Sequence, residues 1–269
     1  MTVLAGSLVE GTRLSVLDDV LDLAAVQPST SGELFVALDA VTGSSALRRA
    51  LTDPGNRPER KAAVVRQLFG PRLGGQAVRV LESAVGLRWS SASAFLDALE
   101  RQAIRAALAT ALNRGALDDV IDALFRFDRI MHAEPALQVA LEDNRRPLEA
   151  REGLIDSLLA GRADEVTVAL AKRALRQRSR SLFHAMESML TVAAGLRHRS
   201  VARVVVARPL DEAQEARLRA ALAKSLGRPV DLEVIVDPNV VGGARVVIGD
   251  RVIEGTIQQK LTDISRLFG

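Results

Sequence analysis

The chain has 269 residues, of which 48% are hydrophobic and 3% aromatic, and it contains no cysteine and no tyrosine. Its 36 basic and 33 acidic residues give a net charge of only +3, so the pI of 9.9 overstates how basic the protein is at neutral pH. The composition suits a globular protein of more than one domain, and it excludes disulfides, thiol catalysis, cysteine metal sites and a base-stacking surface rich in aromatic residues.

The first part of the chain, from Ser7 to about Leu196, has the apolar periodicity of helices. Leu14, Leu17 and Leu21, for example, share one face of an expected first helix. Helix-breaking residues separate the periodic segments at residues 27–32, 53–58, 70–75, 145–147 and 161–162. The pattern predicts a bundle of amphipathic helices joined by short connections.

This helical part contains an internal repeat with an offset of 90 residues. Residues 46–69 align with residues 136–159 with seven identities in 24 positions, and the breaker after the first helix keeps its register. A chance match between Ala- and Leu-rich helices is the alternative explanation. We interpret the pattern as a duplication, which gives two helical units at residues 1–100 and 101–196.

The last part, residues 197–269, is expected to form a small α/β domain. It has two β-branched strands at residues 201–207 and 230–236, separated by a helix at 209–227 for which Asp211 is a plausible N-cap. A hairpin follows, with strands at 244–248 and 251–254 and a turn at Gly249-Asp250, and a helix over 256–268 closes the chain. The predicted fold class is therefore mainly α, with duplicated helical units followed by a small α/β domain.

No group of residues points to catalysis, a cofactor or a metal ion. His132, His184 and His198 are scattered and form no ligand pair, and no phosphate-binding glycine loop opens a helix. The acidic pairs Asp18-Asp19 and Asp118-Asp119 are interpreted as charges near helix N-termini. The sequence therefore favours a protein that is not an enzyme.

The most basic segment is residues 162–203, whose nine basic and three acidic residues give +6. Lys172, Arg176 and Arg180 are spaced i, i+4, i+8, which places them on one stripe if the helix is continuous. The stripe could be a solvated helix face, a docking site for an acidic partner helix, or a phosphate-binding site.

Nothing in the sequence predicts secretion or membrane insertion. Residues 1–17 lack the basic start of a secretory signal and include Glu10, and apolar runs such as 190–196 are too short to cross a bilayer. A reducing, cytoplasmic location is compatible with the absence of cysteine.

The C-terminal hairpin region resembles the signature of the F-type ATP synthase delta subunit family, which includes the mitochondrial oligomycin sensitivity conferral protein. In that pattern an acidic start precedes a glycine pair, an apolar strand, a Gly-Asp turn and a second strand that ends at glycine before a basic helix. The matching residues are Asp237, Gly242, Gly243, Gly249, Asp250, Val252, Ile253, Gly255 and Leu261. The chain is longer than usual members by about one repeat, so it is similar to a lengthened bacterial form with a duplicated helical unit.

The resemblance implies a mechanical function. In this family the helical domain grips the amphipathic N-terminal helices of alpha subunits, and the C-terminal domain holds the b subunits. Together they form a peripheral stalk, or stator, which prevents the catalytic head from turning with the rotor. The resemblance thus implies a non-catalytic subunit without a cofactor or bound nucleic acid, attached to the cytoplasmic face of the bacterial plasma membrane only through the complex. The alternative is a helical adaptor that binds nucleic acid through the stripe at residues 172–180.

Overall fold

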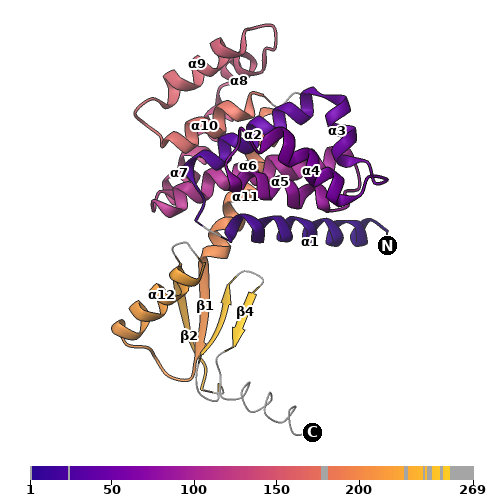
Figure 1. Ribbon diagram of the computed structural model, residues 1–269. Helices are drawn as coiled ribbons and strands as arrows, with labels where there is room; N and C mark the ends of the chain where they lie inside the picture. Colours follow the sequence, from indigo (N-terminus) through magenta and orange to yellow (C-terminus); the bar gives the residue numbers. More distant parts are fainter. Residues whose placement is uncertain are drawn as a thin grey trace. The chain divides into compact units, whose positions relative to one another are not determined.

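The computed structural model describes residues 2–23, 25–176, 181–226, 230–238, 240, 244–248 and 251–254. The chain divides into two compact units, Met1–Ala193 and Ala194–Gly269. The first unit is helical and the second contains the sheet (Figure 1). The mainly α fold class with a small α/β domain is confirmed.

Within the residues that the structure describes, the helical part begins with five helices, continues through one long helix, and ends with five more. The first five are α1 (Thr2–Asp22), α2 (Pro28–Gly43), α3 (Ser45–Thr52), α4 (Pro58–Phe69) and α5 (Gly75–Gly86). The long helix is α6 (Ala92–Asn113). It is followed by α7 (Leu117–Ala133), α8 (Pro135–Glu142), α9 (Leu148–Leu159), α10 (Glu165–Ala174) and α11 (Leu182–Ser200).

The starts of most helices recur at intervals of 90 residues, whereas α2 and α7 begin at residues 28 and 117. Helices α1, α6 and α11 begin at residues 2, 92 and 182, while α3, α4 and α5 begin at 45, 58 and 75 and α8, α9 and α10 at 135, 148 and 165. The turns recur as well. The Asp53 side chain accepts a hydrogen bond from the backbone nitrogen of Gly55 at 2.8 Å, and Asp143 accepts one from that of Arg145 at 3.1 Å.

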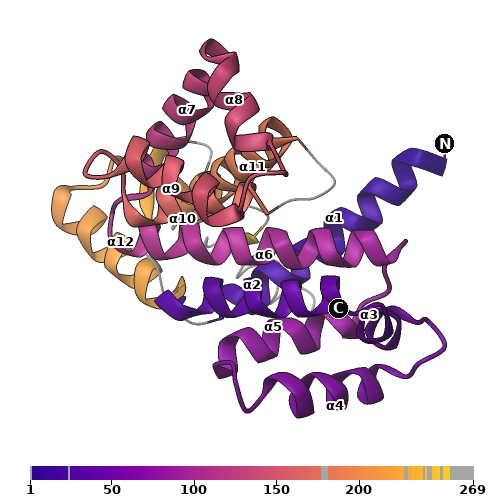
Figure 2. The same cartoon turned by 90° about the horizontal axis from the view of Figure 1, so that it is seen from above.

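Helix α6 lies in the middle of the helical part. Residues 102–109 are consecutively buried, which means that the helix is covered on every side along this stretch. It packs against α1, α2 and α5 and also against α7 and α10. Figure 2 shows α2 and α5 on one side of α6 and α7 and α10 on the other. The boundary expected between residues 100 and 101 falls inside this helix.

The structure corrects the first expected breaker. Residues 27–32 were expected to separate two helices, but α2 begins at Pro28 and includes Ser29–Gly32. Proline is compatible with the first position of a helix because its missing N–H has no partner there. Buried Thr30 donates to the Gln76 side chain at 2.9 Å, and Ser31 donates to the carbonyl of Ala103 at 2.8 Å, so this polar first turn is packed against α5 and α6.

In its described residues, the second unit contains a four-stranded sheet and a helix that packs on it. Its elements are β1 (Val201–Val206), α12 (Glu212–Leu226), β2 (Asp231–Val236), β3 (Ala244–Ile248) and β4 (Arg251–Glu254), with strand order β2-β1-β3-β4. Strands β1 and β2 are parallel and α12 connects them, whereas the other neighbours are antiparallel. The predicted bounds of the hairpin strands are confirmed. So is the N-cap, since Asp211 accepts from the backbone nitrogen of Gln214 at 2.7 Å.

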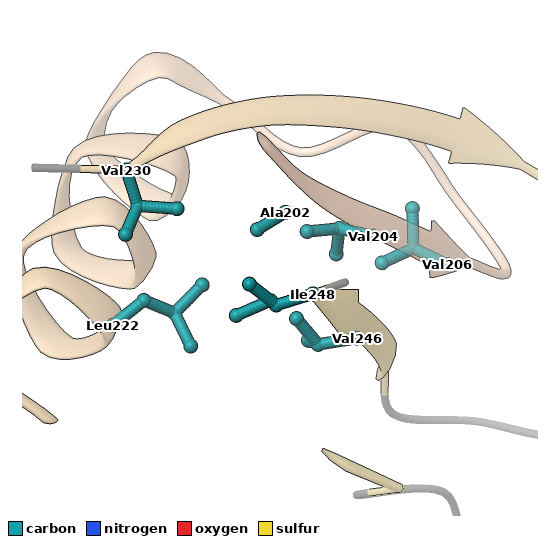
Figure 3. Packing of buried hydrophobic residues seen from close by; sticks show 7 residues of the cluster. All are labelled: Ala202, Val204, Val206, Leu222, Val230, Val246 and Ile248. Atoms are coloured by element: carbon teal, nitrogen blue, oxygen red, sulfur yellow. The ribbon is translucent and has the colours of Figure 1, made fainter. Parts of the chain in front are cut away.

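One face of this sheet forms the core with α12. Alternate residues of β1 and β3 point to that face, as expected for a half-buried strand, and Leu222 of α12 packs against them (Figure 3). The buried cluster consists of Ala202, Val204, Val206, Leu222, Val230, Val246 and Ile248.

Candidate interaction surfaces

An ion-pair network joins α1 to α6. The carboxylate of Asp18 accepts hydrogen bonds from Arg101 and, at 2.8 Å, from Gln102, while Asp22 accepts one from Arg105 at 2.7 Å. Arg105 also lies 3.6 Å from Asp18, and the side chains of Arg105 and Asp18 are only 1% and 2% exposed. Buried charges of this kind are tolerated because each carboxylate faces a guanidinium.

The network lowers the pKa of Asp18. Burial alone would raise this pKa, but the hydrogen bond from Arg101, the charges of Arg105 and Arg101 and the hydrogen bond from Gln102 together outweigh it. The net result is a pKa below the ordinary value of 3.8, so Asp18 is charged at neutral pH.

The structure corrects the interpretation of the first acidic pair. Asp18 lies in the last turns of α1, which spans Thr2–Asp22, and its side chain is buried rather than capping a helix N-terminus. Asp118 and Asp119, in contrast, lie in the first turn of α7 as expected. The acidic pair alone does not show where its helix begins. A helix that starts just before Asp18 and one that continues toward the N-terminus, as α1 does, both contain the pair.

Arg173 connects the two halves of the helical unit. Its guanidinium stands over the ring of Phe35 at 4.5 Å and forms an ion pair with Asp39 at 2.8 Å. Its Nε lies 3.9 Å from Glu100. Because the Arg173 side chain is only 10% exposed, this contact between α10 and the α2–α6 pair belongs to the interior. Arg173 belongs to the basic segment of residues 162–203, and no pattern in the sequence predicts a role for it.

A groove runs beside Arg173. Its volume is about 590 Å³, and its walls come from α2 and α6 on one side and from the α8–α9 turn, α9 and α10 on the other. Arg151 and Arg176 line it together with Asp97 and Glu100, so charges of both signs face the space.

The predicted basic stripe is not a free basic surface in the part that the structure describes. Lys172 pairs with Asp156 at 2.7 Å, and Arg176 pairs with Glu152 at 2.9 Å, so carboxylates of α9 neutralise both. Helix α10 ends at Ala174, before Arg176, and Arg180 lies outside the described residues. Helix α10 is therefore too short to place Lys172, Arg176 and Arg180 on one helical stripe.

The C-terminal signature is described only in part. Asp237 donates its backbone N–H to Val206 at 2.9 Å and accepts from that of Val240 at 3.1 Å, which makes a turn directly after β2. Val252 and Ile253 pair with Val247 and Val246 of the neighbouring strand. The remaining signature residues, together with the expected helix at 256–268, lie outside the described part: Gly242, Gly243, Gly249, Asp250, Gly255 and Leu261.

The face of the sheet opposite α12 is a second candidate surface. On β1 and β2 it carries an ion pair between Arg203 and Glu233 at 3.1 Å, and beside it lies Ile235 with 38% of its surface exposed. Such a mixed apolar and charged strand face is suited to a protein partner.

The described residues contain no group of three or more metal-ligating side chains. In the same part of the chain, no helix is both long enough and apolar enough to cross a membrane. His132 packs against Phe183 with ring centroids 4.0 Å apart and the ring planes tilted by 46°, and His184 lies on the surface of α11 near Glu187.

Comparisons with known proteins identify similar chains. The family model described as ATP synthase delta (OSCP) subunit matches residues 104–268. The ATP synthase subunit delta of Streptomyces avermitilis is 42% identical over 255 residues, which cover 94% of this chain and 93% of the relative. The proteins of the same name from Parafrankia sp. and Cutibacterium acnes are 40% and 32% identical, and the alignments cover 88% and 94% of this chain and 85% and 96% of those relatives.

The family model and the relatives match different parts of the helical unit. The family model begins at residue 104, inside α6, and therefore leaves α1–α5 outside. The alignments with the relatives cover nearly the whole chain, so those relatives share sequence in the region of α1–α5 as well.

Proposed function

Because the chain belongs to the ATP synthase delta (OSCP) subunit family, we propose that it is a non-catalytic stator subunit that links the catalytic head to the b subunits and resists rotor torque. It serves the F-type ATP synthase and is held at the cytoplasmic face of the bacterial plasma membrane through that complex. The observation that carries this proposal is the family match over residues 104–268, which spans α6–α11 and the sheet unit.

In this proposal each of the two units binds a different partner. The helical unit contacts the N-terminal helices of alpha subunits, and the sheet unit contacts the b subunits. In support, the helical unit offers several exposed amphipathic helices, and the sheet presents the face of Arg203, Glu233 and Ile235 opposite α12. Both are surfaces of the kind that bind partner helices.

We also propose that the helical part is a duplication in which α6 is shared. One copy is α1–α6 and the other is α6–α11, so α6 closes the first copy and opens the second. The 90-residue recurrence of helix bounds and the start of the family match inside α6 support this arrangement. Two linked binding units raise the effective concentration of the second contact, which suits a part that must not detach under load. Superposition of the two copies in a crystal structure of the chain tests the duplication, and unrelated packing of α1–α5 and α6–α10 contradicts it.

The stator function is tested on membranes from a strain that lacks this chain. We expect the detergent-solubilised ATP synthase of the parent strain to contain the chain, and membranes without it to retain ATP hydrolysis on the head but lose coupled ATP synthesis. Adding back the full chain restores coupling. A complete, active complex that does not contain the chain contradicts the proposal.

The described residues do not favour the alternative of nucleic-acid binding. Lys172 and Arg176 are paired with carboxylates, and phosphate contacts would have to displace these.

A further inference from the structure

The outward face of α7 carries an aromatic side chain with half of its surface exposed. Phe125 is 51% exposed, and Ile130, further along the same helix, is 45% exposed. In contrast, Phe69, Phe95 and Phe127 are at most 6% exposed. In a chain with 3% aromatic residues, an exposed phenylalanine is a marker of an interaction surface.

Two arginines stand on the same face. Arg126 and Arg129 are exposed, and the structure gives Arg126 one hydrogen bond, to the carbonyl of Asp122 in its own helix at 3.3 Å. Within the described residues, no carboxylate forms an ion pair with either guanidinium. Both positive charges therefore face solvent beside Phe125.

The corresponding face in the first copy shows how such a surface is used. Ninety residues before Phe125 lies Phe35, in α2, and Arg173 of α10 covers its ring at 4.5 Å and pairs with Asp39. The two helices occupy the same place in their copies, because their inward positions match. Leu34 and Val41 are fully buried in α2, as are Leu124 and Met131 in α7.

The charges on the two faces are opposite. Asp39, which accepts the ion pair from Arg173, corresponds to Arg129, and Val36 corresponds to Arg126. A guanidinium suits the face of α2, whereas the face of α7 requires a carboxylate. Asp122 also lies on this face and repels carboxylates there, so we expect the ion pair at Arg129, toward the C-terminal end of α7.

We propose that the α7 face formed by Phe125, Arg126, Arg129 and Ile130 binds an amphipathic helix of another subunit. The docking side of that helix carries a carboxylate for Arg129 and, one turn away, an apolar side chain that covers Phe125. This inference rests on the proposed function only in that the partner belongs to the assembled ATP synthase.

Photo-crosslinking in the assembled complex tests the proposal. The full chain carries p-benzoylphenylalanine in place of Phe125, the complex is isolated in mild detergent and irradiated, and the joined peptides are identified by mass spectrometry. We expect the crosslink to reach a helical segment of a different subunit that has an acidic residue within one turn of the attachment point. Crosslinks confined to this chain, including α12 with its acidic first turn, or to a segment without acidic residues, overturn the proposal.

Charge reversal provides an independent measurement. We expect R126E/R129E to dissociate from the isolated complex at least about tenfold faster than the parent chain. The melting temperature should fall only slightly, because neither arginine has an ion pair to lose among the described residues and the one new like-charge contact is between position 126 and Asp122. The matched control is R57E/R60E, which makes the same charge change at two exposed arginines at the start of α4. Equal dissociation rates for the two variants overturn the proposal. Absence of the parent chain from the complex instead contradicts the stator function.

Discussion

The network between α1 and α6 leads to a quantitative prediction for Arg105→Met. The Arg105 side chain is 1% exposed and faces Asp18 at 3.6 Å and Asp22 at 2.7 Å. Methionine keeps the unbranched shape but removes the charge. The substitution therefore takes away the cation that faces two carboxylates while changing the packing as little as possible.

The magnitude follows from the burial of each group. Removing one partner of a buried ion pair costs about 3–5 kcal/mol. Asp22 is 15% exposed, and Arg101 still binds Asp18, so we expect the lower end, about 3 kcal/mol, or roughly a hundredfold in the equilibrium constant. The loss of stability cannot exceed the free energy with which α1 binds to the rest of the unit. The reason is that α1 packs mainly against α5 and α6 and can detach before the rest unfolds.

Two measurements distinguish detachment from global unfolding. Urea unfolding followed by circular dichroism reports the whole helical unit, and amide hydrogen exchange of residues 11–22 reports α1. The matched control is Arg114→Met, since Arg114 is 44% exposed and pairs with Asp164 and Glu165 at the surface, where the loss should stay below about 1 kcal/mol. If Arg105→Met is as stable as the control and α1 exchanges at the parent rate, the reasoning is refuted.

The second copy suggests a rescue of the same variant. The residue that corresponds to Asp22 is Leu112, so the second copy has an apolar side chain in place of this carboxylate. We expect D22L/R105M to recover most of the stability that R105M loses, because replacing a buried ion pair with apolar residues of similar volume is often neutral or stabilising, and Asp18 keeps its hydrogen bonds from Arg101 and Gln102. A double variant less stable than R105M indicates that the charges fix the position of α1 as well as its affinity.

Three further predictions concern acid, the Arg173 contact and the α12 cap. The pKa of Asp18 is lower in the folded chain than its ordinary value of 3.8. The contribution of Asp18 to the free energy of unfolding is therefore complete above about pH 5 and is lost as the pH falls through the folded pKa. The protection of the α1 amides from hydrogen exchange should decrease over this range in the parent chain but not in D18N. Arg173→Ala should lower the free energy of unfolding by about 2–4 kcal/mol, against less than about 1 kcal/mol for Lys172→Ala in its partly exposed pair, both measured by urea unfolding. Asp211→Ala should cost about 1 kcal/mol through loss of the N-cap of α12, which thermal unfolding of the sheet unit detects.

The sequence predicts the elements well where local chemistry determines them. The hairpin strands and the Asp211 cap depend on β-branched runs and on a capping residue, and both are where they were expected. The polar first turn of α2 was missed because Thr30 and Ser31 look like loop residues. They are helical because Gln76 and the Ala103 carbonyl accept hydrogen bonds from their hydroxyl groups, and these acceptors are 46 and 72 residues away.

The candidate surfaces were less predictable because they depend on pairing across the fold. Lys172 and Arg173 are adjacent in the basic segment, yet one pairs at the surface with Asp156 and the other is buried over Phe35. Charge counting along the chain cannot distinguish them, since the distinction comes from α9 and α2. The repeat itself contains a usable signal: aligning the copies pairs Phe35 with Phe125 and Asp39 with Arg129, which marks positions where the copies have different partners.

In the proposed duplication, the shared helix α6 would let the lengthened chain act as one rigid part of the proposed stator. Two copies joined by a flexible linker would each bind, but a load on one would be absorbed by the linker before it reached the other. Here the junction is α6 itself, buried on every side over residues 102–109, and α1–α10 form part of one compact unit. Arg173 adds a second connection between the copies through Phe35 and Asp39. A force applied to α1–α5 must therefore either disrupt a buried helix or be transmitted to α7–α10, and transmission is the less costly of the two.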